Sequence, residues 1–337
     1  MLRVAGIGAG YFSRFHYDAW QRIDGVDLVG ACDLDSAALR AEVPNLAHFN
    51  DASVMLGTLD PDIVDIITPP SSHAGLIRRA IDQGARAIIC QKPFCRDLAE
   101  AQCVATAAQA AGIALIIHEN FRFQPWYRAL GGMIRQGDFG DVMQVTFRLR
   151  PGDGQGPRAY LDRQPYFQRM PRFLIHETGV HWIDTFRFLL GEPEAVWADL
   201  RRINPAIDGE DAGIVVFSYS GGRRAVFDGN RLADHPATNR RRTMGECLVE
   251  GTDLIALLDG DGRIRCRKFG DNAWTDSGLI APETGFGGDC VHALQSHVVE
   301  ALKNGTPFEN LAHDYLPVIR AELAIYESHE TGRRIPL

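Results

Sequence analysis

Lysine is the scarcest charged residue of this chain. Three lysines, at positions 92, 268 and 303, stand against thirty-two arginines. The lysine in AIICQKPFC, residues 87–95, closes an apolar run and precedes a proline. Lysine carries a compact ammonium whose pKa shifts readily, whereas arginine stays charged and does not exchange protons. Lys92 therefore either occurs by chance or is required for a chemical function, and the other sequence motifs distinguish these alternatives.

Other features are missing too. The seven cysteines are scattered and form no C-x-x-C pair or metal-ligand spacing, so we expect neither a disulfide framework nor zinc. No apolar run reaches the eighteen or so residues of a membrane-spanning helix. The first ten residues, MLRVAGIGAG, enter a strand pattern at once and leave no room for a signal peptide. These absences predict a cytoplasmic protein.

Charge and length set further bounds. The net charge of −8 argues against nucleic acid or an anionic membrane as the main partner. Hydrophobic residues make up 45% and charged residues 23%, an ordinary globular composition. A chain of 337 residues is long for a single core and predicts two domains.

The first part of the chain alternates apolar strands with helices. Continuous apolar runs occur at 3–8, 26–33, 63–69, 85–91 and 113–120, with helical patterns between them. Strands that are apolar on both faces and spaced by helices predict an α/β domain with a doubly wound parallel sheet. In that fold, ligands bind beyond the carboxyl ends of the strands. We predict such a domain over residues 1–122.

The pattern changes after residue 122. Alternating apolar and polar residues appear in seven short runs between 142 and 269, which is typical of antiparallel strands. Helical patterns occur at 173–191, 290–305 and 315–332. We therefore predict a second, α+β domain over 123–337 with an open, mostly antiparallel sheet. The Pro/Gly-rich stretch 151–172 is a long loop, and such loops are usually functional or disordered.

A glycine-rich turn follows the first strand. GIGAGYFS places Gly8 and Gly10 in G-x-G-x-x-S, and glycine lets a pyrophosphate approach the start of the next helix. The second strand ends in Asp33, and an acidic residue there binds a ribose hydroxyl pair and repels a 2′-phosphate. This arrangement predicts NAD as cofactor, with NADP disfavoured. A glycine turn that binds nothing is the alternative.

Two further strand ends carry candidate residues. TPPSSH, residues 68–73, follows the third strand, and His73 there is either a packed or capping histidine or a contact to the cofactor. Lys92 ends the next strand, at the ligand edge of the sheet, and Pro93 favours an extended Lys92. This position favours a functional role for Lys92 over a chance occurrence.

The helical pattern FLIHETGVHWIDTFRFLLG, residues 173–191, holds a second cluster. Glu177, His181 and Asp184 are spaced to share one helix face. A histidine flanked by carboxylates suits a general base. The same residues are equally compatible with a structural hydrogen bond. His176, Glu177 and His181 have the wrong spacing for H-E-x-x-H, so we expect no metal.

Taken in order, these segments resemble the Gfo/Idh/MocA family, the glucose–fructose oxidoreductase and inositol dehydrogenase group. The resemblance rests on GIGAGYFSRFH with His16, TPPSSH, QKP, NFRFQP, GVHWID and ESHETGRRI, and it runs over the whole chain. The family implies a Rossmann domain followed by an open α/β sheet that commonly builds oligomers. We accordingly expect a homodimer or homotetramer.

The resemblance also implies residue roles. Lys92 matches the lysine beside the nicotinamide, His181 the general acid/base, Glu177 a substrate or orienting contact, and Asp184 a trailing aspartate. Gln91 stands where the family usually has glutamate. The expected cofactor contacts are Gly8, Gly10, Tyr11, Phe12, Asp33, Thr68, Pro69, His73, Gln91, Lys92 and Asn120. Arg122 matches the family's N-x-R and is an expected substrate contact. The loop 151–172 and residues 228–235 supply the other candidates, with ordinary loop packing as the alternative for each: Tyr160, Arg163, Tyr166, Arg172 and His235.

The implied activity is an NAD(P)-dependent oxidoreductase acting on CH–OH groups. Hydride would pass between nicotinamide and a secondary alcohol of a sugar, sugar derivative or cyclic polyol, with Lys92 and His181 handling the proton. Two alternatives stay open. One is a non-catalytic dinucleotide-binding regulatory sensor, and the other is a sugar–sugar oxidoreductase that holds its cofactor tightly.

Overall fold

The computed structural model describes residues 1–337, and the chain forms two units. The first unit comprises Met1–Asn120 and Val291–Pro317, and the second comprises Phe121–Cys290 and Val318–Leu337. Residues 291–317 thus belong with the N-terminal part of the chain. The local sequence pattern did not indicate this return.

The first unit is built on a six-stranded sheet in the order β3-β2-β1-β4-β5-β6, and every pair in it is parallel. Its strands are β1 (Leu2–Ile7), β2 (Val26–Cys32), β3 (Ala47–Phe49), β4 (Ile63–Ile66), β5 (Ala87–Gln91) and β6 (Ala114–His118). This order is that of dinucleotide-binding doubly wound sheets. The predicted Rossmann fold is confirmed, although the sequence did not reveal the short edge strand β3.

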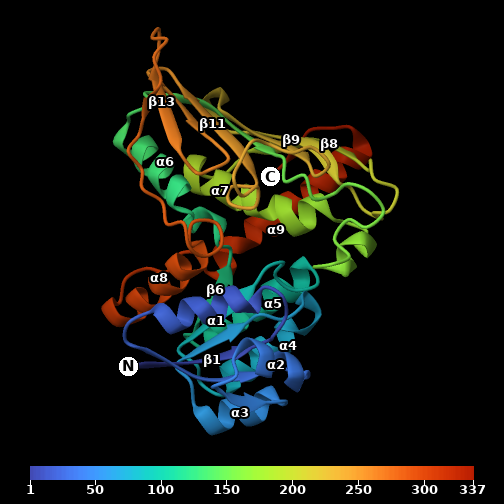
Figure 1. Ribbon diagram of the computed structural model, residues 1–337, viewed down its shortest axis with the longest axis vertical. Helices are drawn as coiled ribbons and strands as arrows, with labels where there is room; N and C mark the ends of the chain where they lie inside the picture. Colours follow the sequence, from blue (N-terminus) through green and yellow to red (C-terminus); the bar gives the residue numbers. More distant parts are fainter. The chain divides into compact units, whose positions relative to one another are not determined.

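Helices cover this sheet. They are α1 (Ser13–Arg22), α2 (Ser36–Glu42), α3 (Ala52–Leu59), α4 (Pro70–Asp82), α5 (Leu98–Ala110) and most of α8 (Cys290–Asn304). Every residue of β4 and β5 is buried, so both faces of the sheet centre are covered (Figure 1). This burial explains why those strands are apolar throughout.

The second unit is built on a nine-stranded sheet in the order β14-β13-β12-β11-β7-β10-β9-β8-β15. Only β10 and β7 pair in parallel, so the predicted mostly antiparallel sheet is confirmed. The strands are β7 (Val142–Leu149), β8 (Ala195–Arg201), β9 (Ala212–Ser218), β10 (Arg224–Asn230), β11 (Gly245–Gly251), β12 (Leu254–Leu258), β13 (Ile264–Lys268), β14 (Thr275–Asp276) and β15 (Ile335–Pro336).

One face of this sheet carries helices. Figure 1 shows α6 (Pro125–Gln136) and α7 (Val180–Leu190) on the same side of the strands. The Trp182 ring stacks on Phe147 of β7 at 4.0 Å, and Phe186 meets Phe217 of β9. The long helix α9 (Ala312–Thr331) ends beside β8, where the Ala198 N–H donates to Ser328 Oγ at 2.9 Å. The core of the unit lies between these helices and the sheet.

The segment before α7 differs from expectation. Residues Leu174–Gly179 form a π-helical turn, and the α-helix begins only at Val180. Because a π turn closes hydrogen bonds from residue i to i+5, Glu177 lies in a wider helical turn than His181 and Asp184, which are both in α7. The prediction of one continuous helical pattern over 173–191 is therefore corrected for Leu174–Gly179, which are π-helical.

The loop 151–172 is ordered by buried amide side chains. Asn204 Nδ2 donates to the carbonyls of Gly154 and Gly156 at 2.7 and 2.9 Å. Gln168 Nε2 donates to those of Pro157 and Ala159. A short 3-10 helix, Pro165–Arg169, lies within the loop. The sequence allowed the loop 151–172 to be either functional or disordered. These hydrogen bonds show that the loop is ordered.

Candidate functional site

The turn after β1 requires glycine at its first position. Gly8 has a φ of 119°, and a Cβ there would come within 2.6 Å of the Ile67 carbonyl oxygen. Gly10 faces open space, with nothing within 4 Å of where a Cβ would lie. Ser13, at the third position of the motif, is buried, and its hydroxyl donates to the Gly10 carbonyl at 2.7 Å. The turn therefore has the shape that lets a pyrophosphate approach the start of α1.

Asp33 lies at the end of β2, beside this turn. Its Oδ2 accepts the Ala9 N–H at 2.7 Å, and its Oδ1 accepts the Asp35 N–H at 2.8 Å. Two backbone donors thus orient the carboxylate. Tyr11 and Phe12, also in the turn, are half-buried.

The turn after β4 contains the next expected contacts. Pro69 is exposed and Thr68 half-buried, while His73 is fully buried on α4. The His73 Nε2 bonds to the Thr68 carbonyl oxygen at 2.7 Å, and burial lowers the pKa of His73 to about 4. His73 is therefore neutral at pH 7 and holds the turn in place, as the packed-histidine alternative predicted.

A buried polar chain runs beneath Lys92. Asp65 Oδ2 bonds to His16 Nδ1 at 2.8 Å, and His16 Nε2 meets Gln91 Nε2 at 2.9 Å. Gln91 Oε1 accepts the Lys92 N–H at 2.8 Å. Because Gln91 Nε2 can only donate, His16 Nε2 accepts and His16 Nδ1 carries the proton. His16 is thus a neutral ring in one fixed tautomer.

Lys92 itself is half-buried and follows the last residue of β5, at the carboxyl edge of the sheet. The peptide bond between Lys92 and Pro93 is cis. Asn120, the last residue of the N-terminal segment of the first unit, is 2% exposed, and its Nδ2 lacks a hydrogen-bond partner within the protein. A buried donor of this kind is normally satisfied by a ligand or water.

In the second unit, His181 is stacked on an aromatic ring. The rings of Phe121 and His181 lie 3.8 Å apart at an angle of 4°. Next to Phe121, Arg122 makes a bidentate pair with Asp184, with Nε–Oδ2 and Nη2–Oδ1 distances of 2.7 and 2.6 Å. Asp184 is fully buried. The ion pair therefore fixes the segment that carries Phe121 against the helix that carries His181.

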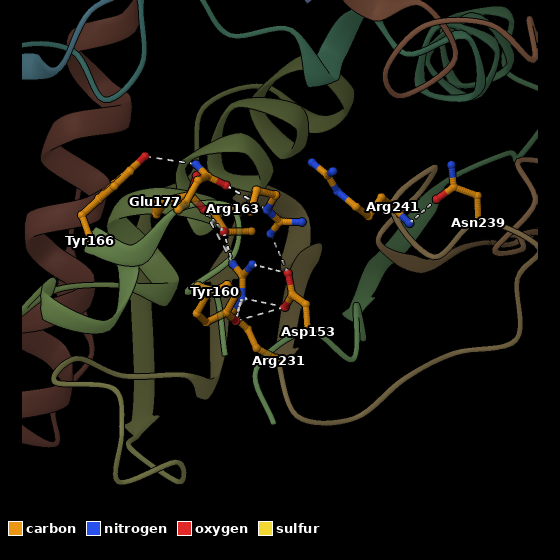
Figure 2. A network of polar contacts seen from close by, with 10 residues as sticks. Asp153, Tyr160, Arg163, Tyr166, Glu177, Arg231, Asn239 and Arg241 are labelled. Atoms are coloured by element: carbon orange, nitrogen blue, oxygen red, sulfur yellow. Dashed lines mark hydrogen bonds and ion pairs between the residues drawn. The ribbon is translucent and has the colours of Figure 1, made fainter. Parts of the chain in front are cut away.

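A network of polar contacts surrounds Arg231, directly after β10 (Figure 2). Its guanidinium bonds to both oxygens of Asp153, to the Tyr160 hydroxyl at 2.7 Å and to Thr178 Oγ1 at 2.6 Å. Glu177 Oε2 lies 3.6 Å from Arg231 Nη1 and accepts a bond from the Thr178 hydroxyl. The network joins the loop 151–172 to the π-helical turn.

Three expected substrate residues meet in this network. Tyr160 is buried in it, and Arg163 pairs with Asp153 Oδ2 at 3.2 Å. Tyr166 accepts a hydrogen bond from Gln164 and is 58% exposed. The other residues expected to contact substrate have partners elsewhere in the same unit. Arg122 pairs with Asp184, the Arg172 guanidinium lies 4.2 Å from the centre of the Tyr326 ring, and His235 Nδ1 bonds to the Arg150 carbonyl at 2.7 Å.

Sequence reasoning missed Asp153, Arg231 and the partnership of His16 with Asp65. Asp153 lies in the loop PGDGQGP, where only its charge among glycines distinguishes it. Arg231 follows a strand of ordinary pattern and resembles any surface arginine until its burial is known. Asp65 interrupts an apolar strand, and an acidic residue inside a buried strand is a signal that could have been used.

Two features are missing from the structure. No group of three or more His, Cys, Asp and Glu side chains is arranged to hold a metal ion. None of the helices has both the length and the apolar character needed to span a membrane.

Comparison with known proteins agrees with this geometry. Residues 2–119 match the oxidoreductase family model with an NAD-binding Rossmann fold, and residues 127–251 match the GFO/IDH/MocA C-terminal domain. The chain is 33% identical to a D-apiose dehydrogenase of Paraburkholderia graminis, over 100% of this chain and 90% of that protein. It is 27% identical to an inositol 2-dehydrogenase of Rhizobium meliloti, over 78% and 81%.

A solved structure is similar over nearly the whole chain. An oxidoreductase from Agrobacterium radiobacter, in complex with NAD+, L-tartaric acid and magnesium, superposes with a TM-score of 0.88 at 27% identity, covering 99% of this chain and 98% of that one. The glycine turn, the Asp33 carboxylate and the unsatisfied Asn120 amide fit a dinucleotide, and both family models match in order. The chain belongs to the Gfo/Idh/MocA family and is an NAD-binding oxidoreductase of the dehydrogenase type.

Proposed function

We propose that the chain oxidises a CH–OH group of a small sugar or polyol, with NAD as the hydride acceptor. The observation that carries this proposal is the placement of Lys92. It follows β5 at the ligand edge of a dinucleotide-binding sheet, and its backbone is fixed by the buried chain through Gln91, His16 and Asp65. A compact donor at that edge suits a reacting hydroxyl oxygen.

Each catalytic candidate has a separate task in this proposal. Lys92 donates a hydrogen bond to the substrate oxygen and stabilises negative charge that develops there. His181 takes the hydroxyl proton as general base, with its ring held flat against Phe121. Asp184 has a positioning role, because both its oxygens bind Arg122 and it is fully buried. Glu177 and Arg163 face the sugar hydroxyls.

The cofactor contacts follow from the first unit. Gly8 and Gly10 leave room for the pyrophosphate at the start of α1. Asp33 accepts hydrogen bonds from the ribose hydroxyl pair, and its negative charge disfavours the 2′-phosphate of NADP. Bound NAD supplies the hydride acceptor. Tyr11, Phe12, Thr68 and Asn120 complete the proposed cofactor contacts. His73 holds the turn that carries Thr68, and Gln91 holds the backbone of Lys92.

The relatives suggest where to look for the substrate. Similarity over the whole chain to a D-apiose dehydrogenase supports an aldose of pentose size as substrate class. An inositol is the second choice, because the inositol 2-dehydrogenase matches at lower identity and over less of the chain.

We also propose a homo-oligomer formed through the second sheet. Its outward residues form a partly exposed row across neighbouring strands, and Met143 and Ile214 on the same sheet are 50% and 44% exposed. The row consists of Trp197, Val216, Val226, Thr146, Leu248 and Leu257. Apolar side chains gathered on one face are typical of an interface. Light scattering of wild type against Leu248→Arg tests this, and a wild-type monomer contradicts it.

The activity is tested by the near-ultraviolet absorbance of reduced nicotinamide. Purified protein receives NAD or NADP together with D-apiose, other pentoses, hexoses, inositols and sugar acids. We expect absorbance to rise with NAD and a pentose-sized aldose. Detectable NAD binding with no turnover on any substrate would overturn the dehydrogenase proposal and favour the sensor. Nicotinamide that co-purifies through dialysis would instead favour a sugar–sugar oxidoreductase.

A further inference from the structure

Arg231 is a buried cation with an unusual set of partners. It is 1% exposed, and its guanidinium donates to two segments that are distant in sequence. Towards the loop 151–172 it bonds to Asp153 and Tyr160, and towards the π-helical turn it bonds to Thr178. Figure 2 shows the guanidinium with Asp153 and Tyr160 on one side and Glu177 on the other, and its dashed contacts run to both sides.

Burial makes these contacts obligatory. Burying an arginine is strongly unfavourable unless its charge is paired and its donors are satisfied. Asp153 supplies the charge: burial alone would raise the pKa of its carboxyl, but Arg231 and Arg163 hold that pKa below its usual range. Asp153 is therefore ionised at neutral pH, and the Arg231 guanidinium holds it through two hydrogen bonds.

Through its partners, Arg231 also reaches two side chains at the rim of the network. Asp153 Oδ2 is shared with Arg163, whose side chain is 23% exposed. On the other side, Thr178 bonds to Arg231 and to Glu177, whose side chain is 19% exposed. One buried cation thus orients one partly exposed cation and one partly exposed carboxylate.

The loop conformation depends on the same group. Tyr160 has a φ of 68°, a left-handed conformation that is unfavourable for a residue other than glycine. Its ring packs against Phe167 and Phe173, and its hydroxyl bonds to Asp153 and Arg231. Without these contacts, nothing in the sequence favours that conformation at residue 160.

We propose that Arg231 is a positioning residue that clamps the loop 151–172 onto the π-helical turn and thereby aims Arg163 and Glu177 at the hydroxyl groups of the sugar. This inference rests on the proposed function for the identity of the ligand. The clamp itself rests only on the contacts within the second unit.

The test compares three variants. Arg231→Lys keeps the charge but removes the fork, and Tyr160→Phe removes a single hydroxyl. Arg150→Lys is the matched control. Arg150 is half-buried and pairs with Asp228 at 2.6 Å, and it does not bond to the Arg231 partners Asp153, Tyr160 and Thr178. The readouts are kcat and KM for the sugar, NAD affinity, the melting temperature, and the rate of tryptic cleavage after Arg158, whose side chain is 75% exposed.

A positioning role predicts a specific split between these readouts. In Arg231→Lys, KM for the sugar rises about tenfold, kcat changes less than about threefold, and NAD affinity is unchanged. Cleavage after Arg158 becomes about tenfold faster. Tyr160→Phe shifts KM and cleavage in the same direction by less, and Arg150→Lys shifts neither.

Two results would overturn the clamp. One is a folded Arg231→Lys protein with wild-type KM and wild-type cleavage. The other is a fall in kcat and in the melting temperature without any change in KM, as expected of a purely structural residue. If Arg231→Lys does not fold, Tyr160→Phe decides by the same readouts. If the wild-type protein oxidises no sugar, the proposed function fails, whereas the cleavage rates still decide whether Arg231 holds the loop.

Discussion

Gln91 donates a hydrogen bond from Nε2 to Nε2 of His16 at 2.9 Å, deep in the first unit, where both side chains are buried. The family resemblance implied a glutamate at this position. The glutamine fixes His16 as a neutral ring, and through Oε1 it also fixes the backbone of Lys92. A residue that the resemblance assigned to the cofactor thus has both its polar atoms bound inside the protein.

Replacing Gln91 tests this link. Gln91→Leu leaves the His16 acceptor and the Lys92 N–H without partners, which we expect to cost about 1–3 kcal/mol of unfolding free energy. It should also lower kcat, because Lys92 loses its anchor. Gln91→Glu retains an acceptor for the Lys92 N–H and serves as the control. Denaturant unfolding and steady-state kinetics measure both effects, and a leucine variant with wild-type stability and turnover contradicts the account.

Lys92→Arg tests the need for a compact donor. The variant should fold and bind NAD normally, yet lose about 100-fold or more in kcat, because a planar guanidinium cannot occupy the position of an ammonium. Lys268→Arg, at an exposed position, is the matched control and should leave kcat and NAD affinity unchanged. Kinetics together with NAD titration separate turnover from binding. Wild-type turnover in Lys92→Arg would remove Lys92 from the mechanism.

His181→Asn tests the general base. We expect kcat to fall by about 100-fold or more, with little change in NAD affinity, because the imidazole handles a proton and does not hold the cofactor. The control is His313→Asn, since the His313 side chain is 49% exposed and lies on a helix outside the proposed site. The account fails if His181→Asn turns over sugar as fast as the control.

Asp33→Asn tests cofactor choice. Loss of the negative charge should weaken NAD binding by about five- to tenfold and weaken NADP binding less or not at all, so the preference for NAD narrows. Isothermal titration with both cofactors gives the ratio directly. An unchanged ratio would mean that Asp33 does not face the adenosine ribose.

Acid stability should depend on His73. Its pKa is lowered by burial to about 4, against an ordinary value of 6.5. Between these values the unfolded chain binds a proton that the folded protein does not, so stability falls as the pH drops from about 6.5 to 4. The full effect of such a shift is about 3 kcal/mol. Urea unfolding at several pH values should show a flatter profile for His73→Asn than for wild type, and equal profiles would contradict the assignment.

Part of this picture could be predicted from the sequence. The Rossmann strands were visible because β4 and β5 are buried on both faces, and the second sheet was visible because its strands alternate. The π-helical turn was not predictable, since Leu174–Gly179 has the composition of an ordinary helix. Arg231 was hidden for a different reason: its partners Asp153, Tyr160 and Thr178 are distant in sequence, and only folding brings them together.

The central claim is that hydride leaves a sugar carbon for NAD at this site. Its most direct test uses D-apiose with deuterium on every carbon-bound position, incubated with the protein and unlabelled NAD. Mass spectrometry of the reduced cofactor should show one added deuterium, and Lys92→Arg should form that product about 100-fold more slowly. Reduced cofactor without deuterium, or no reduced cofactor with any aldose or inositol labelled in the same way, would contradict the account.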